Sequence, residues 1–288
     1  MNRLNAYWRL MRLDKPIGTL LLLWPTLWAL WLASHGHPSL ANMTVFVLGT
    51  LLMRSAGCVM NDLADRRIDP HVARTSQRPL ASGEVTPREA LVLAALLSLV
   101  AFGLVLTRNH LTLALSLPAL FLAASYPLTK RFFPLPQAYL GIAFGFGIPM
   151  AFAAVTGSVP LLAYQLMLAN VFWTIAYDTE YAMVDRNDDI RLGIHSSALL
   201  FGRWEVTVIM LCYAAALALL AWIGASAHLG LFYAAGLVVA SALALYHYVL
   251  IRTRDRTLCF EAFLNNNWLG GAVFAGLAAD LLRQSNGG

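Results

Sequence analysis

The 288-residue chain carries few charges for its length, and this composition excludes most classes of soluble protein. Only 12% of its residues are charged, 59% are hydrophobic and the mean hydropathy is +0.64, whereas a soluble globular domain carries about 25% charged residues. The net charge is +5, and the basic residues are scattered between apolar segments. They form no basic stripe, so nucleic acid is not an expected partner. The composition predicts an integral membrane protein with the lipid bilayer around it.

Apolar segments of about the length needed to cross a bilayer follow one another along the whole chain. The first is followed by no small-residue cleavage site, so we expect it to be retained as a helix. The fifth contains Pro149 and glycines at 141, 145 and 147, which favour a kink or close helix contact. The sequence predicts an all-α, polytopic membrane protein in which residues 1–288 form one domain with nine transmembrane helices, at 17–34, 44–60, 89–107, 111–126, 138–155, 160–178, 206–223, 228–250 and 266–283.

The loops between these segments differ in charge according to the side on which they fall. One side receives seventeen of the twenty Lys and Arg residues, the other side receives Arg108 and Arg283, and Arg54 lies inside the second segment. Because loops rich in Lys and Arg stay in the cytoplasm, this bias predicts a cytoplasmic N-terminus. We expect a multi-pass protein of the bacterial inner membrane.

Acidic residues are concentrated at two places on the predicted cytoplasmic side. One cluster, 61–69, follows the second segment and the other, 177–189, follows the sixth; together they hold eight of the fifteen Asp and Glu residues. Residues three, four and seven apart share a helix face. If both helices extend past the membrane surface, each presents a stripe of carboxylates, from Asp62 to Asp69 and from Asp178 to Asp189.

Stripes of like charge repel one another unless a cation lies between them. Mg²⁺ takes oxygen ligands and commonly bridges carboxylates to substrate phosphates, while nearby Arg and Lys residues suit direct phosphate binding. Two other interpretations remain open: the carboxylates are solvated and paired with neighbouring arginines, or they form the ion site of a cation-coupled carrier. Their place at helix ends, rather than in mid-membrane, weakens the carrier interpretation.

The motifs resemble those of a known enzyme family. Asn61-Asp62-x-x-Asp65-x-x-x-Asp69 and Asp185-x-x-x-Asp189 are similar to the two motifs of the UbiA superfamily of intramembrane aromatic prenyltransferases. The nine apolar segments, 78–83 and 126–131 extend the resemblance over nearly the whole chain. Segments 14–19, 24–26 and 177–185 resemble one subgroup of the family, the 4-hydroxybenzoate polyprenyltransferases of ubiquinone biosynthesis.

The resemblance implies Mg²⁺-dependent transfer of a polyprenyl group from polyprenyl diphosphate to the ring carbon ortho to the hydroxyl of 4-hydroxybenzoate, with release of diphosphate. It implies catalytic roles for Asp65, Asp69, Asp185 and Asp189, and metal ligands at Asn61, Asp62, Asp65, Asp69, Asp185 and Asp189. Substrate binding is expected of Arg54, Arg66, Arg78, Lys130, Arg131 and Asp178. The alternatives within the superfamily are other acceptors, such as a naphthoate, homogentisate, chlorophyllide or haem.

Overall fold

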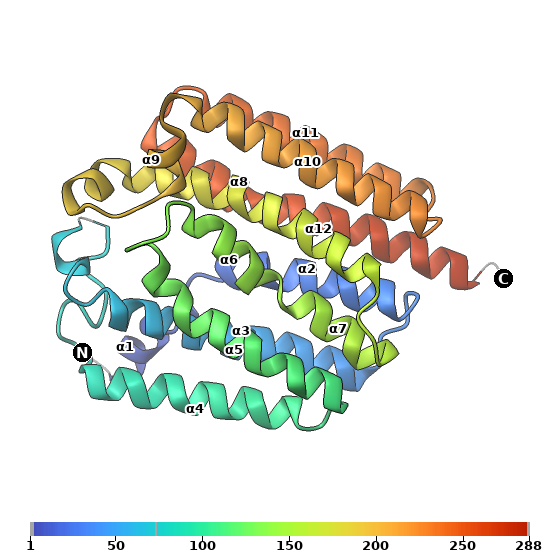
Figure 1. Ribbon diagram of the computed structural model, residues 1–288, viewed down its shortest axis with the longest axis horizontal. Helices are drawn as coiled ribbons and strands as arrows, with labels where there is room; N and C mark the ends of the chain where they lie inside the picture. The colour runs from blue at the N-terminus through green and yellow to red at the C-terminus, as the bar shows by residue number, and fades with distance from the viewer. Residues whose placement is uncertain (1–2, 73, 287–288) are drawn as a thin grey trace.

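The computed structural model describes residues 3–72 and 74–286, and over this part of the chain it contains helices and no strands. The helices run side by side as a bundle, and the chain begins and ends at opposite ends of it (Figure 1). The elements are α1 (Arg3–Leu10), α2 (Ile17–Ala33), α3 (Leu40–Ala64), η1 (Asp69–His71), α4 (Pro87–Val105), α5 (His110–Thr129), α6 (Pro136–Gly145), α7 (Gly147–Thr156), α8 (Leu161–Leu192), α9 (Ser197–Phe201), η2 (Gly202–Trp204), α10 (Glu205–Ser226), α11 (Leu231–Ile251) and α12 (Arg256–Asn286).

Each of the nine predicted segments lies largely within these long helices. In the described residues, six helical units are long and apolar enough to cross a membrane: α3, α4, α5, α6 with α7, α9 with α10, and α11. The apolar helix α2 is shorter, with 17 residues. Helices α8 and α12 are not among the six; α8 carries the acidic cluster 177–189, and α12 contains three consecutive asparagines at 265–267. The all-helical membrane architecture is therefore confirmed.

Local sequence signals set several helix starts. Thr86 and Glu89 form a capping box around Pro87 at the start of α4, which satisfies two backbone N–H groups that the helix leaves unpaired. The Asn109 side chain accepts a hydrogen bond of 2.9 Å from the backbone N–H of Thr112 at the start of α5. The second cap lies in the short connection between α4 and α5.

The fifth segment breaks where its glycines predict a break. It forms two helices, α6 and α7, that meet at Phe146. A Cβ atom at Gly141 would lie 2.9 Å from Cα of Val171, and one at Gly147 would collide with the Thr26 side chain. The glycines therefore serve both expected purposes, a kink and close contact with α8 and α2.

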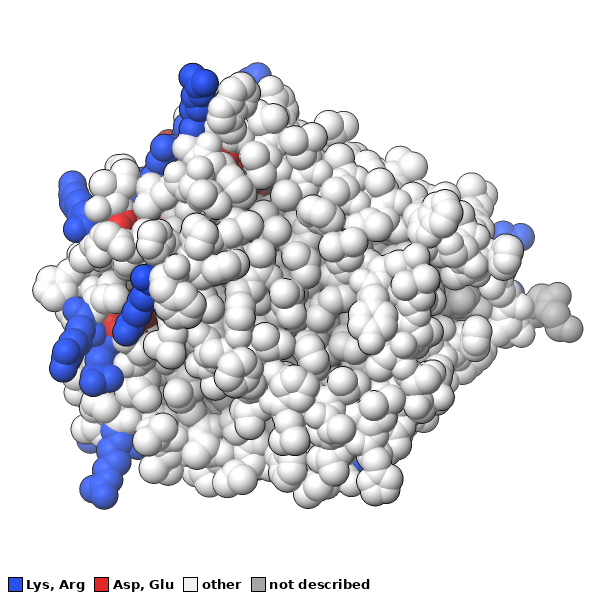
Figure 2. All heavy atoms as spheres, viewed as in Figure 1, with Lys and Arg blue, Asp and Glu red and all other residues white. Residues whose placement is uncertain are grey.

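Charged side chains gather at one end of the bundle. Figure 2 shows Lys and Arg at the end where the loops after α3 and α8 lie, while most of the remaining surface in view is uncharged. This separation agrees with the loop bias in the sequence. Both acidic motifs lie at this charged end.

Helices α11 and α12 pack closely through Gly236 and Gly276. A Cβ atom added to Gly276 would lie 2.7 Å from the carbonyl oxygen of Phe232 and 3.0 Å from Cα of Gly236. Both neighbours are backbone atoms, so a side chain at this position would force the helices apart. Small residues commonly allow such contact between membrane helices.

We predict that Gly276→Ala destabilises the protein by about 1–3 kcal/mol, the usual cost of overpacking. Thermal unfolding in detergent measures this loss. Gly103→Ala in α4 is the matched control, because a Cβ there meets nothing within 4 Å and alanine favours helix by about 1 kcal/mol over glycine. Equal stability of the two variants would show that the α11–α12 contact does not require glycine.

Candidate functional site

The first acidic motif lies where α3 ends, and its helical stripe is shorter than the spacing predicts. Helix α3 stops at Ala64, Asp65 is its C-terminal cap, and Asp69 begins the separate turn η1. The expectation that one helix continues through Asp69 is therefore wrong. Asp62, Asp65 and Asp69 are nevertheless all buried, at 1%, 2% and 4% exposure.

The second motif has the geometry that its spacing predicts. Helix α8 continues for 32 residues to Leu192 and carries Asp178, Asp185 and Asp189 before Gly193 ends it in a left-handed conformation, with φ +64°. These three carboxylates and the first motif line the same cavity. The structure thus brings the two motifs together from helices that are more than a hundred residues apart.

Basic side chains hold most of these carboxylates. Arg78 donates to Asp62 at 3.0 Å and to both Asp69 oxygens at 3.1 and 3.0 Å. Lys130 donates to Oδ2 of Asp65. Asp62, Asp65 and Asp69 are therefore buried together with basic partners that balance their negative charge.

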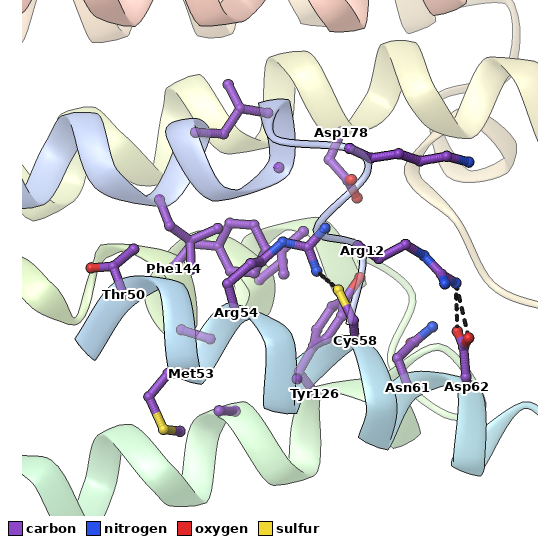
Figure 3. Close-up of a pocket in the computed structure, with 18 of the residues that line it drawn as sticks. Arg12, Thr50, Met53, Arg54, Cys58, Asn61, Asp62, Tyr126, Phe144 and Asp178 are labelled. Atoms are coloured by element: carbon purple, nitrogen blue, oxygen red, sulfur yellow. Dashed lines mark hydrogen bonds and ion pairs between the residues drawn. The ribbon is translucent and has the colours of Figure 1, made fainter. Parts of the chain in front are cut away.

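Two arginines of this site escape the motif analysis. Arg12 donates to both oxygens of Asp62 at 2.9 Å (Figure 3), and Arg74 donates through Nε to Asp185 at 3.0 Å. The Arg74 guanidinium also lies 4.6 Å from the centre of the Tyr181 ring. The only sequence signal for either residue is the excess of basic residues on this side.

Two of the predicted substrate-binding residues lie outside the cavity. Arg66 and Arg131 are exposed and do not line it. Arg66 donates to the Leu63 carbonyl at 3.3 Å, and Arg131 donates to the Ala64 carbonyl at 2.8 Å. As placed, both side chains cap the end of α3, because the last carbonyl groups of a helix lack partners within it.

Arg54 lies deeper, on α3, and its guanidinium points into the cavity beside Cys58, with Asp178 on the opposite wall (Figure 3). It donates to the Cys58 sulfur through Nη1, while its buried Nε has no hydrogen-bond partner. Gly18 makes room for it, since a Cβ there would lie 2.9 Å from Nε of Arg54. An arginine donor without a partner suits an anionic group of a ligand.

The cavity has a volume of about 1360 Å³ and two chemically different parts. Its charged end contains the two motifs with Arg12, Arg74, Arg78 and Lys130, and Asn61 lies at the same end. The rest is lined mainly by apolar side chains of α3, α4, α5 and α7, among them Val45, Phe46, Met53, Leu99, Phe102, Leu117, Leu120 and Met150. Since Leu99 and Leu117 are 64% and 62% exposed, the apolar part extends to the outer side of α4 and α5.

The charged end has a donor set that fits a divalent cation. Within the described residues no three His, Cys, Asp or Glu side chains are placed to hold a metal ion, and arginines and a lysine contact most of the motif carboxylates. However, the buried Oδ1 of Asp65 has no hydrogen-bond partner and lines the cavity with Asn61 and Asp69. An unpaired carboxylate oxygen among other oxygen donors is the chemistry that Mg²⁺ prefers.

Burial and charge pairing have opposite effects at this end. Burial raises the pKa of Asp65 above the ordinary value for an aspartate, although Lys130 opposes this shift. Burial also disfavours the charged form of Arg78, but attraction to Asp62 and Asp69 outweighs it and raises the pKa of the guanidinium. A further positive charge near Asp65 would therefore stabilise its ionised form.

We predict that Arg78→Met lowers stability by about 3–5 kcal/mol, because it removes the arginine that donates to both oxygens of the buried Asp69, whereas Asp62 keeps Arg12. Arg66→Met is the control: Arg66 is exposed and contacts only a backbone carbonyl, so its loss is expected to change stability by less than about 0.5 kcal/mol. Thermal unfolding of both variants checks this. A similar small effect of the two would contradict the burial of the ion pairs.

Comparisons with known proteins agree with this fold. The model of the UbiA prenyltransferase family matches residues 22–270. Relatives named 4-hydroxybenzoate octaprenyltransferase include one from Methylobacillus flagellatus, 67% identical over 98% of this chain and 96% of the relative, and one from Azoarcus sp., 65% identical over 98% of each. A solved UbiA homolog from Aeropyrum pernix has a TM-score of 0.78 and 26% identity over 88% of this chain and 96% of its own. Another from Archaeoglobus fulgidus, bound to GPP and Mg²⁺, has a TM-score of 0.68 and 19% identity over 96% and 99%, which shows the shared fold. The family match covers most of the chain, and the chain therefore belongs to the UbiA prenyltransferase family.

Proposed function

We propose that this protein transfers a polyprenyl group from polyprenyl diphosphate to the ring carbon ortho to the hydroxyl of 4-hydroxybenzoate, releasing diphosphate. The observation that supports the reaction type is the two-part cavity, with acidic motifs and basic side chains at one end and an apolar channel at the other. The relatives that cover nearly the whole chain and are named for 4-hydroxybenzoate octaprenyl transfer support this acceptor.

The diphosphate belongs at the charged end. Arg12, Arg74, Arg78 and Lys130 surround the two motifs and would bind its oxygens through charge-assisted hydrogen bonds. Asn61, Asp65, Asp69, Asp185 and Asp189 would hold Mg²⁺, and the cation neutralises the charge of the departing diphosphate. Asp62 is assigned as a metal ligand by its motif position, although in the structure both of its oxygens accept from Arg12 and one also from Arg78.

The prenyl chain fits the apolar part of the cavity. Ligand cavities of about 300–1,000 Å³ accommodate drug-sized molecules, whereas this cavity is about 1360 Å³ and extends between α4 and α5. Its apolar walls would keep water away from the electrophilic allylic carbon of the prenyl group, because water would otherwise react there in place of the acceptor. Arg54 and Asp178 lie between the two parts, where Arg54 would bind the carboxylate of the acceptor.

The topology that accompanies this function has nine crossings, a cytoplasmic N-terminus and both motifs on the cytoplasmic side of the bacterial inner membrane. The loop bias of seventeen against two Lys and Arg residues supports it, because basic loops remain in the cytoplasm. Chain ends on opposite ends of the bundle fit an odd number of crossings (Figure 1). Water-soluble diphosphate would then leave toward the cytoplasm, in the step that yields a precursor of ubiquinone.

We predict that purified protein with Mg²⁺, a prenyl diphosphate and 4-hydroxybenzoate forms the ring-prenylated acid, detected by mass spectrometry, and that removal of Mg²⁺ with a chelator abolishes it reversibly. Transfer only to another acceptor, such as a naphthoate or homogentisate, would redirect the assignment within the family. Cation flux in proteoliposomes without prenylated product would favour a carrier instead.

Asp65→Asn and Asp189→Asn are expected to reduce turnover by at least about a hundredfold, since each removes charge at the site of the leaving group. Asp188→Asn is the matched control, because Asp188 neighbours Asp189 but does not line the cavity and instead lies 3.5 Å from Arg256. Full activity of either cavity variant would disprove the assigned roles.

Arg54→Met is expected to raise the KM for 4-hydroxybenzoate by about tenfold or more, while the KM for the prenyl diphosphate changes little, because a charge-assisted hydrogen bond contributes about 1.5–3 kcal/mol. Steady-state kinetics with each substrate varied in turn separate the two effects. An equal rise in both KM values would place Arg54 in general cavity structure and not at the acceptor.

A further inference from the structure

A second polar cluster lies on the opposite side of α8 from the cavity. It consists of Trp173 and Glu180 from α8, Tyr213 from α10, His247 from α11 and Asn266 from α12, all between 0% and 2% exposed. No member lines the cavity. Intramembrane polar groups are costly and usually have a role, and the proposed reaction uses none of these five.

Asn266 and Tyr213 connect the cluster. The Asn266 amide donates to Oε2 of Glu180 at 2.8 Å, and its oxygen accepts from the Trp173 indole at 2.8 Å. The Tyr213 hydroxyl lies 2.9 Å from Oε1 of Glu180, 2.9 Å from Oδ1 of Asn266 and 3.0 Å from Nδ1 of His247. One hydroxyl therefore has three hydrogen-bond partners.

The number of protons available to these contacts distinguishes the ionised from the neutral form of Glu180. The tyrosine has a single proton, and three contacts at its oxygen need three. If Glu180 is ionised, one of two oxygen–oxygen contacts at 2.9 Å has no proton between its atoms. If Glu180 is the neutral acid, it donates to Tyr213, Tyr213 donates to Asn266, and His247 donates through Nδ1.

The surroundings of Glu180 agree with the neutral acid. No Lys or Arg of the described part of the chain is hydrogen-bonded or ion-paired to it. By contrast, Asp62, Asp65, Asp69 and Asp185 each have a Lys or Arg partner. The other nitrogen of His247, Nε2, is buried without a partner. A proton on that nitrogen would be a buried, unpaired donor, so the neutral Nδ1–H tautomer is the favourable form.

We propose that Glu180 is a permanently protonated carboxylic acid that, with Tyr213 and Asn266, fixes the rotation of α8 and so positions Asp178 and Asp185 at the cavity. The two motif residues lie two positions before and five positions after Glu180 on the same continuous helix. Trp173, which donates to Asn266, also connects the cluster to the cavity wall. The centre of its ring lies 5.3 Å from those of Trp28 and Tyr177, and Tyr177 lines the cavity. Glu180 is thus a positioning residue.

The substitution that tests the neutral state is Glu180→Gln. A glutamine amide donates to Tyr213 where the acid does, and its oxygen accepts from Asn266, so turnover and thermal stability are expected within about twofold and a few degrees of the unmodified protein. Glu180→Leu keeps the volume but removes both hydrogen bonds. It is expected to reduce kcat by about tenfold to a hundredfold, as misplaced reacting groups do, at temperatures where the variant remains folded.

Glu205→Gln is the matched control. Glu205 is also 0% exposed, but it accepts from Arg186 at 3.0 and 3.1 Å and from Arg254 at 2.7 Å. Here the loss of charge leaves two arginines without their carboxylate, so a marked drop in thermal stability is expected. The same chemical change at two buried glutamates therefore has opposite outcomes.

Infrared spectroscopy gives a readout that does not depend on the proposed reaction. The protein at neutral pH is expected to show the carbonyl-stretch band of a buried carboxylic acid, and this band is expected to disappear in Glu180→Gln and to persist in Glu205→Gln. Tyr213→Phe, which keeps the ring and removes the hydroxyl, is expected to lower kcat as Glu180→Leu does and serves where the leucine variant does not fold.

Three results would overturn the proposal. They are a Glu180→Gln variant as inactive as Glu180→Leu, absence of the acid band from the unmodified protein, and unchanged kcat in both Glu180→Leu and Tyr213→Phe. Failure of the unmodified protein to prenylate 4-hydroxybenzoate would instead refute the proposed function and leave the infrared result valid.

Discussion

The site depends on one constraint: carboxylates that leave water need countercharges brought from elsewhere in the chain. Asp62, Asp65 and Asp69 are nearly inaccessible, and their partners Arg12, Arg78 and Lys130 come from three different segments. These pairs tie other segments of the chain to the end of α3 and to η1. The electrostatic requirement of the carboxylates therefore also determines how the N-terminal segment, the loop before α4 and the end of α5 assemble around the cavity.

The two halves of the cavity follow from the same separation of charge. Charged side chains concentrate at one end of the bundle (Figure 2), and the lipid-facing helices α4 and α5 contribute apolar side chains to the remainder. An amphiphile with an anionic head and a long hydrocarbon tail matches this arrangement along its length. The cavity thus selects a class of molecule by polarity before any single contact is considered.

Much of this could be predicted from the sequence, because hydropathy and helical spacing are local properties. The apolar segments, the glycine break near Gly147 and the face of α8 that carries Asp178, Asp185 and Asp189 all depend on neighbours within a few turns. The end of α3 was predicted less well, since Asp69 lies on a turn whose direction is set by contacts with Arg78 and not by spacing.

Tertiary pairings were the part that the sequence did not reveal. Nothing local connects Arg12 to Asp62 or Arg74 to Asp185, and residue type alone did not separate Arg66 and Arg131, which contact the end of α3, from Lys130, which reaches the cavity. Similarly, the three consecutive asparagines at 265–267 carry no local signal of their partners. In the structure Asn266 and Asn267 accept from the indoles of Trp173 and Trp24.

The hydrogen bonds between α8 and α12 have a consequence for biosynthesis. Neither helix is among the six that are apolar enough to cross a membrane by composition, and each supplies polar partners to the other through Glu180 and Asn266. Helix α8 is synthesised about seventy residues before Asn266 emerges. During translation Glu180 therefore lacks its Asn266 partner until the start of α12 has been made.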